Sequence, residues 1–88
     1  MATYPLQILA MDREVYNNEV EAIQAKGTEG YLGVLAHHAP LITELAEGTL
    51  TVNEGKGAIR KFKLEGGLLE VGGNHAVILA DGTVEELS

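Results

Sequence analysis

Short apolar segments alternate with glycine-rich breaks along the whole chain. In the segment Thr49–Asn53, Leu50 and Val52 alternate with hydroxyl and amide side chains, which is the period of a half-buried β-strand. Glycines divide the rest of the sequence into segments of roughly six to ten residues, a spacing typical of a sandwich or a barrel. The pattern therefore predicts an all-β fold.

Three of the predicted strands carry apolar side chains on both faces. They are the segments Leu6–Met11, Leu68–Val71 and His75–Ala80. One face of an antiparallel sheet normally meets water, so apolar outer faces indicate that another element or another protein covers them. We expect such a cover here.

Turn residues predict two hairpins near the end of the chain. Asn74 follows a pair of glycines and tolerates a positive φ, so we expect a tight turn between the strands on either side of it. Asp81-Gly82 predicts a second hairpin, which joins Ala76–Ala80 to Thr83–Glu86.

One stretch, Ala39–Gly48, has a helical pattern instead. Pro40 stands near its start, Leu41 and Leu45 are four residues apart, and a glycine ends it. Local propensity favours a two-turn helix, but a helix of fewer than about ten residues is marginal without packing. The local pattern therefore leaves helix and strand open.

The composition excludes a nucleic-acid-binding surface. The 13 acidic and 6 basic side chains leave a formal charge of −7, whereas phosphate binding requires clustered Lys and Arg. Four basic residues do gather in one segment, but Glu54 and Glu65 flank them, and we interpret the segment as a solvated strand or hairpin edge. The four are Lys56, Arg60, Lys61 and Lys63.

No segment has the features of a targeting or membrane-spanning sequence. Charged residues interrupt the first part of the chain, and no stretch approaches the ~20 apolar residues of a transmembrane helix. Cysteine is absent, so neither a disulfide nor a cysteine-based metal site can support the fold. We expect a single domain, residues 1–88, with any membrane association made through a partner protein.

The candidate catalytic residues form no recognisable active site. His37-His38 could contribute to a metal centre with His75 or a carboxylate, yet adjacent residues on a strand point to opposite faces. We therefore favour one solvated histidine and one that is hydrogen-bonded in a loop. The glycines of Gly27–Gly33 lack the Lys and the helix of a phosphate-binding loop, and the only serine is Ser88. These features predict a non-catalytic protein without a metal or a cofactor.

The segment Gly27–Thr43 resembles the signature of the epsilon subunit of F-type ATP synthases. It contains a glycine turn, a Leu-Gly-apolar step, and then His-His-Ala-Pro-Leu followed by an apolar residue and Thr. Further blocks agree in order and spacing across nearly the whole chain, and these are Tyr4–Ala10, Gly48–Leu50, Gly66–Val71 and Val77–Asp81. Ala36 departs from the family pattern, since a proline is common at this position. The difference bears only on how stiff the loop is.

The resemblance implies a two-layer antiparallel β-sandwich of about ten short strands, the N-terminal domain of the epsilon subunit. It implies a non-catalytic rotor subunit of the central stalk, which binds the gamma subunit and the loops of the membrane c-ring and couples proton translocation to ATP synthesis. The alpha and beta subunits carry out the ATP chemistry. The family analogy also makes Ala39–Glu47 a strand, against its local pattern.

The resemblance assigns two sets of contact positions and a location. The turn expected to face the c-ring consists of Glu29, Gly30, Tyr31 and Leu32. The positions expected on the gamma-facing side are Ala10, His38 and Thr43. The implied location is peripheral, at the cytoplasmic face of the bacterial inner membrane, with the plastid thylakoid membrane as the alternative.

Typical members of the family continue into a hairpin of two helices that restrains ATP hydrolysis and in some members binds ATP. Neither role is assigned to this chain, which stops at Ser88, and its initial Met favours a naturally short subunit. Two other hypotheses remain: a free-standing β-domain that binds a ligand through its glycine-rich loop, and an enzyme with a metal at His37 and His38.

Overall fold

The computed structural model describes residues 2–88, which form ten β-strands and no helix. The all-β prediction and the expected number of strands are confirmed. The strands are β1 (Tyr4–Leu9), β2 (Glu14–Val20), β3 (Ala22–Gly27), β4 (Gly30–Leu35), β5 (Leu41–Leu45), β6 (Gly48–Gly55), β7 (Ala58–Leu64), β8 (Gly67–Gly72), β9 (His75–Ala80) and β10 (Val84–Leu87).

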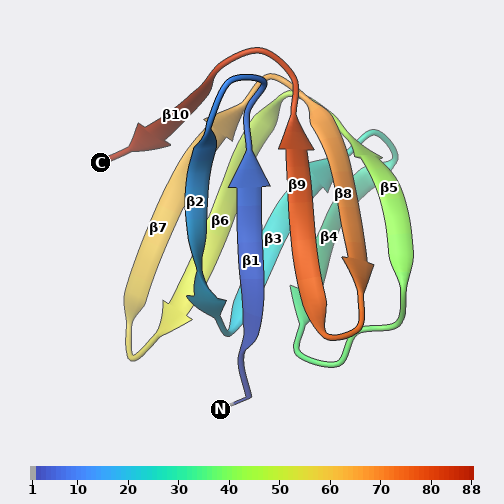
Figure 1. The fold of residues 1–88 in the computed structure, drawn as a ribbon, viewed down its shortest axis with the longest axis vertical. Coiled ribbons are helices and arrows are strands. Elements are labelled where there is room, and N and C mark those ends of the chain that lie inside the picture. The colour runs from blue at the N-terminus through green and yellow to red at the C-terminus, as the bar shows by residue number, and fades with distance from the viewer. Residues whose placement is uncertain (1) are drawn as a thin grey trace.

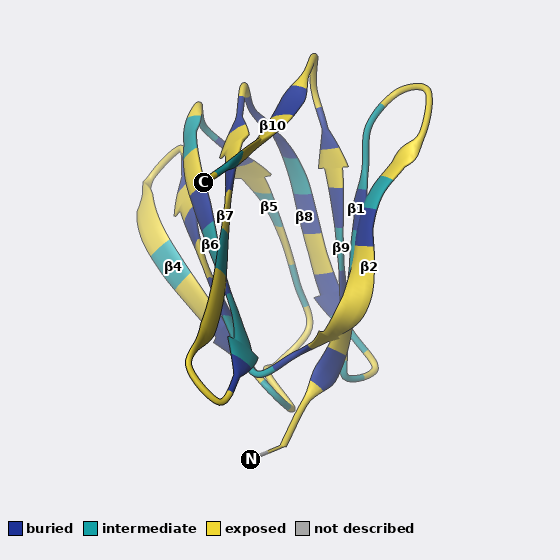
Figure 2. Ribbon diagram, turned by 90° about the vertical axis from the view of Figure 1, so that its left-hand side faces the viewer, coloured by how far each residue is buried: buried dark blue, intermediate teal, exposed yellow. Residues whose placement is uncertain are grey.

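The strands form two facing layers (Figures 1 and 2). One layer has the order β10-β7-β6-β3, with β4 on the far side of β3, and the other has the order β5-β8-β9-β1-β2. The layers are joined where β3 meets β5 at the single pair Gly27–Leu45. All neighbours are antiparallel except β1 and β9, which run in the same direction. The fold is thus the expected two-layer sandwich, with one parallel pair.

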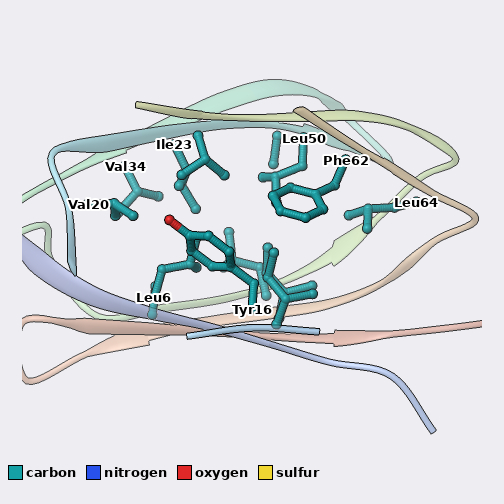
Figure 3. Close-up of a cluster of buried hydrophobic side chains, with 14 of the residues drawn as sticks. Leu6, Tyr16, Val20, Ile23, Val34, Leu50, Phe62 and Leu64 are labelled. Carbon is teal, nitrogen blue, oxygen red and sulfur yellow. The ribbon is translucent and has the colours of Figure 1, made fainter. Parts of the chain in front are cut away.

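The core lies between the layers and follows the alternation in the sequence. Leu50 and Val52 on β6 point inward and are buried, as the period-two pattern predicts. Figure 3 shows side chains of both layers meeting in this space, among them Leu6, Tyr16 and Phe62. The rings of Tyr16 and Phe62 pack edge to face, with centroids 5.4 Å apart.

The stretch with the helical pattern is strand β5. All of its residues pair with β8, from Leu41–Val71 to Leu45–Gly67. Leu45 is buried and Ile42 is exposed, which is the alternation of a strand. A short isolated helix is marginal, whereas pairing with β8 satisfies the backbone and buries Leu45 at the same time, so the tertiary context overrides the local propensity.

One of the two predicted hairpins is confirmed. Gly73 and Asn74 both have φ of 56°, and they form the tight turn that joins β8 to β9. The second prediction is wrong, because β10 pairs with β7 in the other layer and not with β9. Asp81-Gly82 is a bend that lets the chain cross between the layers, where Val84 enters the core.

The basic segment has two kinds of residue. Lys56 at the β6–β7 turn and Lys61 and Lys63 on β7 are exposed, in agreement with a solvated surface. Arg60 differs, because its guanidinium forms ion pairs with Glu54 and Glu86 and lies over the ring of Tyr16. Its side chain belongs to the packing between the layers and not to a solvated edge.

Candidate interaction surface

The residues predicted to contact the c-ring lie at the tip of the β3–β4 hairpin. Thr28 and Glu29 form the turn, and Gly30, with φ of 130°, begins β4. Tyr31 follows with 68% of its surface exposed, while Leu32 packs partly against the core. The tip therefore presents an aromatic ring and a carboxylate to its surroundings.

Backbone hydrogen bonds hold this tip against the end of β5. The N–H of Thr28 donates to the carbonyl oxygen of Glu44 at 3.2 Å, and the N–H of Ala46 donates to that of Lys26 at 2.9 Å. The Gly27–Gly33 segment is a hairpin whose strands pair along their whole length. The segment is therefore an extended hairpin, and not a loop that leads into a helix N-terminus, as a phosphate-binding loop is.

The three residues predicted to contact gamma are not brought together. Thr43 is half-buried in β5, on the side that faces the core. His38 lies in the exposed loop after β4, where its Nδ1 is 2.7 Å from the carbonyl oxygen of Ala39. Ala10 directly follows β1 and packs partly against the core.

The strand register explains this separation. Leu45, Gly67 and Ala80 pair in one row at the end of the layer, and Ala10 follows β1 at that same end. His38 precedes β5 and so lies at the opposite end, roughly 15 Å away at the usual rise per strand residue. A single partner could contact all three positions only through an elongated surface.

A larger apolar surface covers the outer side of the β5-β8-β9-β1 sheet, and we call it the apolar outer face. Leu9, Leu79 and Leu68 form one row across β1, β9 and β8. Val77 and Ile42 lie in the next row, on either side of Glu70. Ile42 is 68% exposed and Leu79 40% exposed. The predicted doubly apolar strands are thus present, although Met11 lies beyond β1 in the turn.

Polar groups lie at the border of the apolar outer face and, at Glu70, within it. Glu44 and Glu70 stand beside Leu68 and Ile42, and Gln7 stands beside Val77. An open hollow of about 570 Å³ adjoins Ile42 and is lined by Pro40, Leu41, Ile42, Glu70, Val71, Gly72 and His75. Exposed apolar side chains with a few polar groups among and around them are the composition of a protein–protein contact surface.

The outer side of the other sheet is mostly polar along β3 and β6, although Tyr31, Leu35 and Ile59 are exposed on β4 and β7. Gln24, Lys26, Thr49, Thr51 and Lys61 line a groove there, together with Tyr31, Gly48 and Leu87. The two sheets therefore differ in what their outer sides can bind. Ile42 was not predicted as a surface residue, because its segment has a helical pattern; in a strand, Leu41 and Leu45 face inward, and Ile42 must face out.

The strongly perturbed titratable groups belong to packing clusters and not to a catalytic cleft. Burial, together with the hydrogen bond that its hydroxyl donates to Glu54, raises the pKa of Tyr16. The hydrogen bonds to Glu86 raise the pKa of Arg60. Both groups close the sandwich between β2 and β7. Within residues 2–88 no three His, Asp or Glu side chains come close enough to hold a metal ion.

The described residues contain no helix that is long and apolar enough to cross a membrane.

His37 and His38, the candidate metal ligands, are both exposed, and the N–H of His37 donates to Oδ1 of Asn74 at 2.7 Å. This bond ties the β4–β5 loop to the β8–β9 turn. The histidine pair therefore has a place in loop packing.

Comparisons with known proteins agree with this architecture. Residues 3–86 match the family described as ATP synthase, Delta/Epsilon chain, beta-sandwich domain. The ATP synthase epsilon chain of Caulobacter vibrioides is 42% identical over 85 residues, which cover 97% of this chain and 98% of that one. The ATP synthase epsilon chain of Moorella thermoacetica is 42% identical over 81 residues, 92% of this chain, but the match spans only 60% of that protein.

A solved structure shows the same fold. A chain in the mitochondrial ATP synthase of Euglena gracilis, determined as OSCP/F1/c-ring in rotational state 1, superposes with a TM-score of 0.90 at 26% identity. The match covers 98% of this chain and 54% of that chain. Its β-sandwich is thus the part that the two chains share.

Proposed function

Because this chain belongs to the ATP synthase delta/epsilon family, as an epsilon-type β-sandwich, we propose that it is a non-catalytic subunit of the central stalk of an F-type ATP synthase. In this role it binds the gamma subunit and the loops of the membrane c-ring, and so helps to couple proton translocation to ATP synthesis. The catalytic alpha and beta subunits are indirect partners.

The apolar outer face is the observation that carries the proposal. Ile42 and Leu79 are exposed on the outer side of a sheet whose inner side already fills the core. Covering such side chains is favourable by about 25 cal/mol per Å² of apolar surface removed from water. We assign this face to the gamma subunit, and we place Thr43, whose half-buried side chain is on the inner side of strand β5, at the border of that contact.

The hairpin tip is the proposed c-ring contact. Tyr31 and Glu29 project from the end of the sandwich, and the hydrogen bonds to β5 fix their position. An aromatic ring with one hydroxyl supplies apolar area and a polar end, which suits contact with polar loops. Ala10 lies at the same end of the sandwich, whereas His38 lies at the other, so we propose both as peripheral gamma contacts.

The net charge of −7 has a role in this assembly. An acidic domain is attracted to basic surfaces of gamma or of the ring loops, and charge complementarity mainly sets approach and register. The location that follows is peripheral, at the cytoplasmic face of the bacterial inner membrane, or alternatively at the plastid thylakoid membrane.

Binding to purified gamma subunit tests the proposal. Ile42→Glu places a charge in the apolar outer face, and we expect it to weaken binding by about tenfold or more. Ile59→Glu is a matched control, since Ile59 is 50% exposed on the outer side of the other sheet, and it should leave binding unchanged. Equal effects of the two variants, or no binding of the wild-type chain, would contradict the proposal.

A salt series tests the electrostatic part separately. Binding should weaken between low and physiological ionic strength, because screening shortens the range of attraction between exposed charges. A negligible salt dependence would remove the role of the −7 charge and leave the apolar contact standing.

A further inference from the structure

Strand β4 has a free edge. It pairs with β3 on one side, and within residues 2–88 no strand pairs with its other side. The sandwich has other free edges at β2, at β10 and along most of β5. Each of those strands carries at least one carboxylate, the usual protection of an edge against pairing with another chain. Strand β4, with the sequence GYLGVL, carries no charge at all.

The backbone groups along this edge point toward solvent at defined residues. The carbonyl oxygen of Lys26 on β3 accepts a hydrogen bond from the N–H of Ala46. The backbone N–H and C=O of Lys26 therefore point away from β4. Its partner Tyr31 is therefore in a non-hydrogen-bonded pair and directs its own N–H and C=O to the free edge. Gly33, two residues further, does the same.

Neighbouring side chains also favour an added strand. Tyr31 and Leu35 flank Gly33 on the outer side of β4 and are 68% and 63% exposed. An incoming strand would cover both through cross-strand contacts. Gly33 has no side chain, and space for a partner side chain remains beside it. The edge thus offers unpaired backbone groups between two uncovered apolar side chains.

We propose that the free edge of β4 accepts an extended, uncharged segment of the gamma subunit as an added strand. This inference rests on the function proposed above. The tip of the β3–β4 hairpin meets β5, because Gly27 pairs with Leu45 and the N–H of Thr28 donates to the carbonyl oxygen of Glu44, so a partner on the apolar outer face can reach the start of β4 around this tip. Main-chain hydrogen bonds would supply affinity, and the alternate side chains would supply specificity.

A second copy of the chain is the weaker candidate for this edge. Pairing along six residues alone buries far less than the roughly 1,200 Å² of a stable interface. Two copies with a charge of −7 each also repel one another. A gamma subunit bound at this edge would, in contrast, also bury the apolar outer face in the same complex, which adds to the interface area.

Amide hydrogen exchange measured by NMR tests the inference on the whole chain, with purified gamma subunit as the probe. We expect the amides of Tyr31 and Gly33 to exchange at least about tenfold more slowly in the complex. The amides of Leu32 and Val34, which pair with β3, should already be protected in the free chain. Binding without slower exchange at Tyr31 and Gly33 overturns the inference but leaves the proposed function intact.

Two variants of one residue complete the test. Gly33→Pro removes the edge-facing N–H without removing a bond to β3, and prolines are tolerated at such edge positions. Gly33→Ala keeps the N–H, and its added carbon would meet only the carbonyl oxygen of Ile23 at 3.8 Å. We expect Gly33→Pro to weaken gamma binding by about tenfold and Gly33→Ala to have no effect.

The remaining outcomes are also decisive. Equal binding by both variants, with thermal unfolding like the wild type, overturns the inference. If the free chain sediments as a dimer with Tyr31 and Gly33 already protected, the edge belongs to a second copy and not to gamma. If gamma does not bind the wild-type chain at all, the proposed function fails together with this inference.

Discussion

The guanidinium of Arg60 on β7 donates two hydrogen bonds to the carboxylate of Glu86 on β10. Nε lies 2.6 Å from Oε2, and Nη2 lies 2.7 Å from Oε1. The same guanidinium stands 5.1 Å from the ring centre of Tyr16 and 5.8 Å from that of Phe62. Arg60 therefore ties the last strand to the sheet and covers the aromatic pair that closes the sandwich between β2 and β7.

Arg60→Met should destabilise the chain more than Glu86→Gln. The first change removes both ion pairs and the cation over the rings, whereas the second removes only the charge of one partner. Because both side chains are partly exposed, we expect the melting temperature to fall by roughly 2–5 °C for Arg60→Met and by less for Glu86→Gln. Thermal unfolding followed by circular dichroism measures both. A larger fall for Glu86→Gln would contradict this order.

Acid should destabilise the chain through Glu86 and Glu65. The hydrogen bonds from Arg60 lower the pKa of Glu86, and those from Thr83 lower the pKa of Glu65. A carboxyl group whose pKa is lower in the folded chain than in the unfolded chain stabilises the fold. This stabilisation is complete above the ordinary carboxyl pKa, and it is lost as pH falls through the lower pKa of the folded chain. We expect stability to fall below about pH 4.5. In Glu86→Gln and Glu65→Gln this acid-dependent loss should be smaller, and an unchanged pH profile would contradict the assignment.

Tyr4→Phe should destabilise the sandwich by about 0.5–2 kcal/mol. The buried hydroxyl of Tyr4 donates to the carbonyl oxygen of Val34 at 2.7 Å, which links β1 to β4 across the core. Urea unfolding at pH 7 measures the loss. Tyr4→Leu, which removes the ring as well, should cost more, and no difference between Tyr4→Phe and the wild type would show that the hydrogen bond adds nothing.

The same residue should make the chain sensitive to alkali. Burial raises the pKa of Tyr4 to about 12, against an ordinary value of 10.0. The unfolded chain therefore releases this proton at lower pH than the folded chain, and stability falls as pH rises from about 10 toward 12. Tyr4→Phe should show a smaller alkaline loss, although not none, because the pKa of Tyr16 is raised too. If Tyr4→Phe and the wild type lose the same stability at high pH, a group other than Tyr4 causes the loss.

Gly67→Ala should be strongly destabilising, and Gly72→Ala should be nearly neutral. Gly67 has φ of 147°, and a Cβ there would overlap the backbone of Leu79 and Ala80 on β9. Gly72 lies at the other end of the same strand with open space around it. We expect a loss of about 2 kcal/mol or more for the first and less than about 0.5 kcal/mol for the second. Denaturant unfolding compares them directly, and similar losses would refute the close approach of β8 to β9.

Tyr31→Asp should weaken the coupling of proton flow to ATP turnover while the sandwich stays folded. Tyr31 is exposed at the hairpin tip, so its replacement leaves the core unchanged and alters the proposed c-ring contact. Membranes carrying the variant should hydrolyse ATP with reduced proton pumping, read from a pH-sensitive dye. Tyr31→Phe, which keeps the ring, is the matched control. Unchanged coupling in Tyr31→Asp would remove this residue from the contact.

Much of the fold could be predicted because the relevant signals are local. Glycine followed by Asn74 specifies a turn with positive φ, and the alternation at Leu50 and Val52 specifies an inward and an outward side. The turn at Glu29–Leu32 was placed by the family resemblance and not by a local pattern. Which strands lie side by side is a different matter, because pairing joins segments far apart in the chain.

The sequence by itself determined the all-β class, most strand and turn positions, and the family resemblance carried by Gly27–Thr43. Only the tertiary structure decided that β10 pairs with β7, that Arg60 joins the packing while Lys61 stays solvated, and that Ile42 belongs to an outer apolar face. The physical reason is that backbone hydrogen bonds and side-chain burial are satisfied together only when both layers are assembled. A short segment can meet its local preference in several ways, and its partners select one.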